Sequence, residues 1–270
     1  MATVPEDRLE DTRKFKAADM IALGSAAAIL VVYGFLRGPE FSLTGSRFLA
    51  ALGITATFAL LAWFAGGVNW SGAFGGSAVA FIMAVRDPRM FLALTLVFAL
   101  TLAATRVGHA RKQQLRTAEP PGGRSASQAL ANLGVAALVV ALACTGWPLL
   151  ALAALAEAAA DTASSEIGMA FPGKTVLITS WKPVPIGMDG GISLFGTLAA
   201  CFAAAMMALL ATVSGLVSIH HAAAIVYAGV LGTLVDSLLG ALLERHGWLN
   251  NDLVNLLSTA AAVGIAWLLM

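Results

Sequence analysis

Charged residues are scarce in this sequence. Among its 270 residues are 16 Lys and Arg and 15 Asp and Glu, so that 11% of the chain is charged. A soluble domain usually has about 25% charged residues, and a disordered chain is richer in charge than this one. So few charged side chains could not cover a water-soluble protein of this size. A soluble domain and a disordered chain are therefore both excluded.

Cysteine is scarce as well. The two cysteines, Cys144 and Cys201, both lie inside apolar runs. This count excludes a secreted scaffold built on disulfides, and the spacing fits no zinc site. The formal net charge is +1, and this balance gives no indication of nucleic acid as a partner.

Hydrophobic residues make up 59% of the chain, and its mean hydropathy is +0.84. A helix needs about 20 mostly apolar residues to cross a bilayer, and open strand edges leave backbone groups unpaired in lipid. The sequence therefore predicts an all-α fold, a polytopic integral membrane helical bundle with about nine spans. The predicted spans lie near residues 19–36, 47–66, 70–85, 90–105, 128–145, 148–167, 192–213, 219–243 and 252–270.

The distribution of Lys and Arg predicts how the chain lies in the membrane. With nine spans, the N-terminal segment and the connections on its side hold twelve Lys and Arg, and the other side holds four. Because Lys and Arg accumulate in cytoplasmic connections, we expect a cytoplasmic N-terminus and a C-terminus outside. Residues 1–18 then form a cytoplasmic polar segment, and residues 19–270 form one transmembrane domain with cytoplasmic loops 106–127 and 168–191.

Three acids lie in one apolar segment, at Glu157, Asp161 and Glu166. A charged side chain costs roughly 2.5–3.5 kcal/mol at the centre of a bilayer, which makes acids that a span retains informative. Glu157 and Asp161 are four residues apart and share one helix face, whereas Glu166 lies about 140° further round from Asp161. The alternative is a polar helix end that lipid headgroups solvate.

Asp236 is a further acid in an apolar segment. Gly232, Asp236 and Gly240 recur every four residues, and a face lined by glycine lets a second helix approach closely. We expect the Asp236 carboxylate to point into that contact, beside the acidic helix. The alternative is a structural hydrogen bond between two helices.

Residues 182–196 are rich in proline and glycine and predict a loop. Gly190 and Gly191 precede a span, so their backbone N–H groups could form an anion site at a helix N-terminus. An ordinary turn is the alternative. Asn250, Asn251 and Asn255 open the last span, where one of them can serve as the N-cap and the others can bind a ligand.

These polar groups fall at the same ends of their predicted spans. The topology puts Asp161, the 182–191 loop, Asp236 and Asn251 at cytoplasmic span ends, together with Arg106 and Lys112. Acids that lie at one depth with amides and cations are more typical of a metal–phosphate site than of a transport path.

One segment matches a phosphate-loop pattern. Residues 168–175 read G-M-A-F-P-G-K-T, which fits GxxxxGK[ST]. A phosphate loop requires a strand before it and a helix after it, whereas here a span precedes the pattern and proline-broken residues follow it. We therefore predict that residues 175–178 are extended or irregular and that Lys174 contacts phosphate only as a point charge.

Several segments together resemble a known family. They are ALAEAAADTASSEIG, PVPIGMDGGISLFGTLA with its Gly-Gly-x-Ser-x-x-Gly motif through Ser193, LGTLVDSLLGALLE and NNDLVN, with weaker matches at TRVGHARK and GRSASQALAN. In this order they resemble the integral membrane family of domain of unknown function 92, which includes transmembrane protein 19-like proteins and plant phytyl-phosphate kinases. The similarity runs from about residue 20 to the end.

The resemblance implies a transfer of phosphate to an isoprenoid lipid, with a prenyl monophosphate as acceptor and a nucleoside triphosphate such as CTP as donor. Mg²⁺ prefers one or two carboxylates with substrate phosphates. Asp161 and Asp236 are the expected metal ligands, and Glu157 or Glu166 would assist as catalytic residues. The remaining expected contacts are with phosphate, at Lys112, Lys174, Lys182, Gly190, Gly191, Ser193, Asn251 and Asn255.

Two other functions are compatible with these residues. A transporter would use the intramembrane acids as ion or substrate sites. A non-catalytic membrane assembly protein would use the polar groups only to pair its helices. Acids at mid-bilayer depth and inverted repeats would favour a transporter, and the sequence shows no clear repeat.

Overall fold

The computed structural model describes residues 19–24, 26, 45–119 and 122–270. Residues 19–24 and 26 are helical, in agreement with the start of the predicted first span. The rest of that span and the predicted polar segment 1–18 lie outside the described residues.

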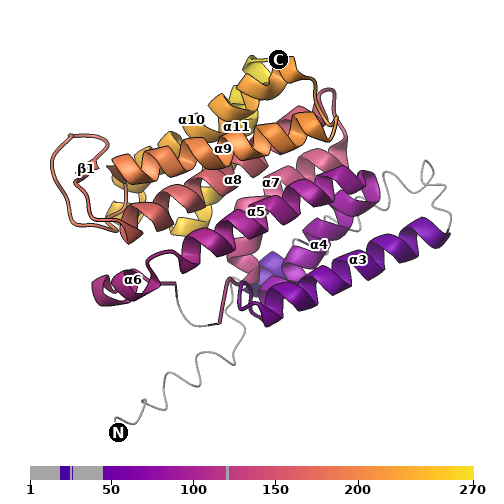
Figure 1. Ribbon diagram of the computed structural model, residues 1–270, viewed down its shortest axis with the longest axis horizontal. Helices are drawn as coiled ribbons and strands as arrows, with labels where there is room; N and C mark the ends of the chain where they lie inside the picture. The colour runs from indigo at the N-terminus through magenta and orange to yellow at the C-terminus, as the bar shows by residue number, and fades with distance from the viewer. Residues whose placement is uncertain (1–18, 25, 27–44, 120–121) are drawn as a thin grey trace, which may run out of the picture.

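Helices account for most of the described chain, and they carry the labels of Figure 1. A two-stranded antiparallel sheet lies between α8 and α9, with Thr175 opposite Ser193. The elements are α3 Gly45–Phe64, α4 Trp70–Arg86, α5 Pro88–Arg106, α6 His109–Leu115, α7 Ala126–Leu142, α8 Trp147–Ala170, β1 Thr175–Leu177, β2 Gly191–Ser193, α9 Leu194–Val213, the 3₁₀ turn Ile219–His221, α10 Ala222–Leu242, the 3₁₀ turn Glu244–His246 and α11 Asn251–Leu268.

The all-α membrane fold is confirmed, since each predicted span from residue 47 onward coincides with one of these helices. Among the described residues, four helices are long and apolar enough to cross a membrane, namely 88–106, 194–213, 219–246 and 251–268. The apolar segments 48–64 and 126–142 are shorter. The count of nine spans stays a prediction.

Contacts between connections show which ends of the helices lie together. Arg106 at the end of α5 donates a hydrogen bond to the carbonyl of Ala65, just after α3. Gly190, just before β2, packs against Ala241 near the end of α10. Figure 1 shows α6 and β1 at this same end of the molecule, on the left. We call it the polar end, and the described parts of the connections lie there, namely residues 65–69, 106–119, 122–125, 171–193 and 243–250.

The opposite end holds the remaining described connections. Arg89, at the start of α5, donates to the carbonyls of Ser214 and Gly215, which follow α9. The guanidinium of Arg86 lies 5.1 Å from the ring centroid of Trp147, at the start of α8. The long helices therefore run up and down between two ends, as the predicted topology requires.

Helix α8 is the centre of the bundle. It packs against α5, α7, α9, α10 and α11, and its residues from Leu149 to Ala160 are all buried. Alanine and leucine favour helix in this segment, and the small alanine side chains let several neighbours approach closely. Its acids lower the hydropathy of α8, so that α8 is not among the four helices long and apolar enough to cross a membrane, and its neighbours shield it from lipid.

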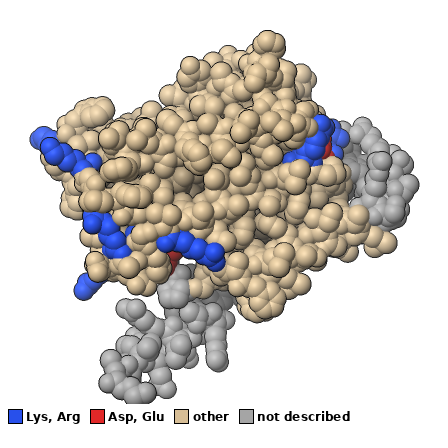
Figure 2. Space-filling view, viewed as in Figure 1, with Lys and Arg blue, Asp and Glu red and all other residues tan. Residues whose placement is uncertain are grey.

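The outer surface has an apolar middle. On the face shown in Figure 2, Lys and Arg gather toward the two ends, and the broad band between them shows no charged residue. The long apolar helices also expose large apolar side chains, such as Leu198, Phe202 and Leu209 of α9. An exposed apolar band between charged ends is the surface that a bilayer requires.

Candidate functional site

The carboxyl groups of Asp161 and Asp236 come together in the structure. Asp161 is on α8 and Asp236 on the adjacent α10, and the two carboxyls are within hydrogen-bonding reach of each other. The hydroxyl of Ser258 on α11 donates to Oδ2 of Asp236 at 3.2 Å. The expectation that the acidic helix and the Asp236 helix lie side by side is confirmed.

Glu157 lies one turn before Asp161, and its side chain is almost completely buried, with 1% of the residue exposed. Its carboxyl interacts with Asp161, Asp236 and Ser258, yet its Oε1 has no hydrogen-bond partner within the described residues. A Cβ at Gly232 would lie 2.5 Å from Cγ of Glu157, so the glycine of α10 makes room for this side chain. A buried acceptor without a partner is costly, which makes Glu157 a candidate for contact with a cation or a proton.

A polar cavity of about 270 Å³ opens beside Asp161 at the polar end. Its walls come from α8, α11, the start of α7 and the segment before it, so it collects residues far apart in sequence. Of the predicted site residues, Asp161, Glu166, Asn251 and Asn255 line it. The other lining residues are Thr117, Ala118, Glu119, Arg124, Gln128, Asn132, Thr162, Ser165 and Met169.

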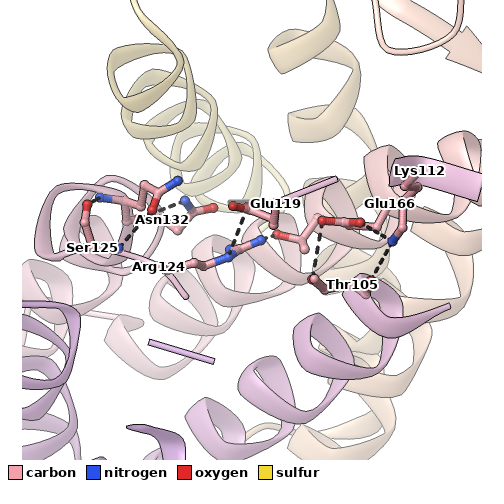
Figure 3. A network of polar contacts seen from close by, with 9 residues as sticks. Thr105, Lys112, Glu119, Arg124, Ser125, Asn132 and Glu166 are labelled. Atoms are coloured by element: carbon pink, nitrogen blue, oxygen red, sulfur yellow. Dashed lines mark hydrogen bonds and ion pairs between the residues drawn. The ribbon is translucent and has the colours of Figure 1, made fainter. Parts of the chain in front are cut away.

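Arg124 supplies a cation at this cavity. Its Nη1 donates to Oγ1 of Thr162 at 3.4 Å, and its charge acts on Asp161 across the cavity. Nε lies 3.9 Å from the carboxylate of Glu119 (Figure 3). This arginine was not among the predicted site residues, although it stands in the weaker family segment GRSASQALAN.

The backbone holds Arg124 in place. Its N–H donates to the carbonyl of Gly67, and its carbonyl accepts from Asn69 N–H, in a short parallel bridge. Gly123 has a φ of +80°, and a Cβ there would lie 2.6 Å from the nitrogen of Val68, so only glycine fits. The next residue, Ser125, caps α7 in a capping box with Gln128.

Lys112 and Glu166 form a buried ion pair next to the cavity. Lys112 is fully buried, and its Nζ lies 2.5 Å from Oε2 of Glu166. Nζ also donates to the carbonyls of Ala104 and Thr105, and the Thr105 hydroxyl donates to Oε1 of Glu166 (Figure 3). The three donors of Lys112 are thus engaged, and the predicted contact of Lys112 with phosphate would require this pair to open.

Lys174 and Lys182 do not line the polar cavity. Both are exposed on the segment that holds β1 and β2. Thr175–Leu177 is a strand and no helix begins at Lys174, so the prediction that residues 168–175 are not a phosphate loop is confirmed. The contact of these lysines with phosphate stays a prediction.

The glycine loop closes on itself and on α10. Gly191 donates its N–H to the carbonyl of Met188, and Ser193 accepts from Gly196 N–H as the N-cap of α9. The backbone N–H groups of Gly191 and Gly196 are therefore already bonded within the segment 188–196. Gly190 packs against Ala241 and Gly240, so the loop covers the end of α10, six residues beyond Asp236. An anion contact at Gly190 or Gly191 stays a prediction.

Ser258 and Asn132 were not among the predicted site residues either, although Asn132 ends the weaker family segment GRSASQALAN. Ser258 is fully buried and follows Asn255 by three residues on α11, a spacing that puts both on one helix face. Asn132 is on α7 and donates to the carbonyl of Gln128. Hydroxyl and amide groups in apolar helices carry a weaker signal than acids, because a helix can satisfy them by itself.

Oxygen ligands dominate the site. Within the described residues, no group of three or more His, Cys, Asp and Glu side chains is arranged to hold a metal ion. Carboxylates with amide and hydroxyl oxygens are nevertheless the donors that suit Mg²⁺, which needs only one or two carboxylates when substrate phosphates complete its shell. Asp161 and Asp236 supply two such carboxylates, and the binding of Mg²⁺ stays a prediction.

Comparisons with known proteins identify relatives of this chain. The chain is 37% identical over 193 residues to an uncharacterized membrane protein of Methanocaldococcus jannaschii, covering 70% of this chain and 79% of the relative. It is 30% identical over 248 residues to the chloroplastic protein VTE6 of Arabidopsis thaliana, covering 87% of this chain and 68% of that protein. Protein PGR of the same plant is 32% identical over 207 residues, with coverage of 64% and 72%.

No solved structure matches this chain. The model of the family described as Integral membrane protein DUF92 matches residues 53–263, which include all the acids discussed above. The protein therefore belongs to the DUF92 family of integral membrane proteins.

Proposed function

We propose that this protein transfers a phosphoryl group from a nucleoside triphosphate, CTP in the first instance, to an isoprenoid phosphate at the polar cavity. The observation that carries the proposal is the convergence of Asp161, Asp236 and Arg124 at one end of the bundle, next to Asn251 and Asn255. The resemblance of the acidic and glycine motifs to plant phytyl-phosphate kinases supports the same chemistry.

The reaction breaks the bond between the terminal phosphorus of the donor and its bridging oxygen. An oxygen of the isoprenoid monophosphate forms the new P–O bond, and the products are an isoprenoid diphosphate and a nucleoside diphosphate. Such transfers depend mainly on positioning and charge stabilisation. Arg124 would neutralise phosphate charge at the cavity wall, and the amides of Asn251 and Asn255 would donate to phosphate oxygens.

Asp161 and Asp236 would hold Mg²⁺, with Glu157 assisting from behind them. Glu166 is a less direct candidate because its two oxygens already accept from Lys112 and Thr105. When bound, the metal ion would supply positive charge to the phosphate oxygens of both substrates.

We also propose that the polar end faces the cytoplasm, where nucleotide is available. The excess of Lys and Arg in the connections at this end supports it. The test places one cysteine at Ala118 in a protein whose Cys144 and Cys201 are replaced, because both native thiols are exposed. A membrane-impermeant thiol reagent should label position 118 only after the cells are permeabilised. Labelling of position 118 in intact cells would show that the polar end faces outward and would refute this proposal.

The enzymatic proposal is tested with purified protein, terminally labelled CTP, Mg²⁺ and a panel of prenyl alcohols and prenyl phosphates. Label should enter the prenyl monophosphates, and Asp236→Asn should lose this activity. Asp87→Asn is the matched control, since it makes the same change at the opposite end of the bundle, away from the polar cavity. A folded wild-type protein that labels no acceptor with any nucleoside triphosphate would refute the proposal.

A further inference from the structure

A second cavity, also of about 270 Å³, lies among α3, α4, α5 and α7. Its walls are apolar, with the rings of Phe58 and Phe98 on one side and small residues of α4, such as Gly72 and Gly76, on another. The two rings pack edge to face with their centroids 5.3 Å apart. Small side chains opposite a wall of aromatic rings leave space for a ligand with an apolar surface.

This apolar cavity extends from the polar end toward the middle of the bundle. Leu94 lines its inner part and precedes Arg106, at the end of α5, by twelve residues. At a rise of 1.5 Å per residue, this corresponds to about 18 Å along the helix. The cavity therefore reaches more than half of the way through a hydrocarbon layer of about 30 Å.

The apolar and polar cavities share a boundary. Glu119, Arg124, Gln128 and Asn132 line both of them. Arg124 stands at this boundary and contacts Thr162, the residue next to Asp161. A molecule with an anionic head and an apolar tail would place its head beside Arg124 in the polar cavity and its tail among α3, α4, α5 and α7.

We propose that the apolar cavity binds the hydrocarbon chain of the acceptor and sets the chain length that the protein accepts. The inference rests on the proposed function, because it takes the acceptor to be an isoprenoid phosphate. Helices α8 and α10 then supply the carboxylates and α11 supplies amide and hydroxyl groups, while α3, α4, α5 and α7 supply the lipid site. The chain length is limited where Leu94, Val97 and Phe58 close the inner part of the cavity.

Gly76 offers the sharpest test of this assignment. It lines the cavity, and a Cβ added there would meet no atom within 4 Å, so a larger side chain can fill the space without a clash. Gly76→Leu and Gly76→Phe should raise the KM for farnesyl and phytyl monophosphate about tenfold or more, and leave that for geranyl monophosphate nearly unchanged. Gly264→Leu on α11 is the matched control, since Gly264 also has open space around it and lies outside both cavities.

A binding experiment separates this inference from the proposed reaction. A farnesyl monophosphate with a diazirine at the end of its chain is photolysed with the protein in the absence of nucleotide. Labelled peptides should come from α3, α4, α5 or α7, and Gly76→Phe should reduce the labelling while Gly264→Leu retains it. The Gly76→Ala variant provides a folded reference if a larger side chain impairs folding.

The outcomes distinguish the two proposals. Labelling of α3, α4, α5 or α7 without any transfer activity would support the tail site and refute the kinase. Transfer activity with an unaltered chain-length preference in the folded Gly76 variants, or label confined to other helices, would refute the tail site and retain the kinase. Absence of both label and activity would overturn both.

Discussion

The two halves of α8 are opposite in character: the first is apolar and buried, and the second buries acids and is partly exposed. From Leu149 to Ala156 every residue is apolar and at most 5% exposed. From Glu157 onward the helix carries three acids among hydroxyl and small residues, and Glu157 and Glu166 are buried as deeply as their apolar counterparts. Burial in the first half stabilises the bundle through packing, whereas burial of the acids in the second half opposes it.

Side chains from other elements compensate the cost of burying the acids in the second half of α8. Lys112 of α6 and Thr105 of α5 bond to Glu166, Arg124 before α7 acts on Asp161, and Ser258 of α11 bonds to Asp236 beside it. The first half requires no such partners. Acids remain buried at this cost, and one oxygen of Glu157 has no partner in the described part of the chain, which favours a role beyond holding helices together.

The largest expected effect is on activity. Asp161→Asn and Asp236→Asn should each reduce phosphoryl transfer by more than about 100-fold, because changes in groups behind metal ligands already cost about 10–100-fold. The double variant should be hardly worse than either single variant if both carboxylates serve one metal ion. Activity, yield and thermal stability are measured on the same preparations. Full activity in either well-folded variant would exclude that residue as a metal ligand.

The Lys112–Glu166 pair should matter most for stability. Lys112→Met leaves Glu166 buried without its cation, and the free energy of unfolding should fall by about 3–5 kcal/mol. Adding Glu166→Gln removes the buried charge and should restore most of that loss. Thermal unfolding in one detergent measures both. Equal stability of wild type and Lys112→Met would show that the pair contributes little.

Two glycines of α10 allow the two halves of α8 to be compared directly, because each glycine packs against one half. A Cβ at Gly229 would lie 3.2 Å from the carbonyl carbon of Ala156 in the apolar half, whereas one at Gly232 would displace Glu157. Each change to alanine should cost about 1–3 kcal/mol of stability through overpacking. Only Gly232→Ala should also lower kcat, by about tenfold, because the displaced side chain lies behind the proposed metal ligands. Equal kcat values in the two variants would contradict this role of Glu157.

The smallest effect is expected at the opposite end, where Asp87 caps α5. Burial acts to raise the pKa of Asp87, but hydrogen bonds and charge from Arg89, with the charge of Arg86, outweigh it and hold the pKa below 3.8. Asp87→Ala should cost about 1 kcal/mol of stability and leave transfer activity unchanged.

The cap at Asp87 also has a definite pH dependence. The pKa of Asp87 is lower in the folded protein than its ordinary value of 3.8. The electrostatic contribution of Asp87 to stability is therefore complete above pH 3.8, and it disappears as the pH falls through the lower pKa of the folded protein. The stability difference between wild type and Asp87→Ala should therefore shrink below pH 3.8. Thermal unfolding midpoints across this range measure it, and a difference that grows on acidification would contradict the assignment.

The sequence alone determined the fold class and the position of the helices. Long apolar runs with few charges require helices that pair their backbone groups internally, and the described helices follow those runs within a few residues. It also identified Asp161, Asp236, Glu157 and Glu166, because an acid in an apolar helix is costly enough to stand out.

Only the tertiary structure decided which polar groups share a site. Arg124 and Ser258 were not predicted, and they become candidate site residues because a backbone bridge and the packing of α11 bring them to Asp161 and Asp236. Conversely, Lys112 pairs with Glu166, while Lys174 and Lys182 lie away from the polar cavity. Periodicity along one helix reports which face a residue occupies, whereas the neighbour on that face is set by contacts between segments distant in sequence.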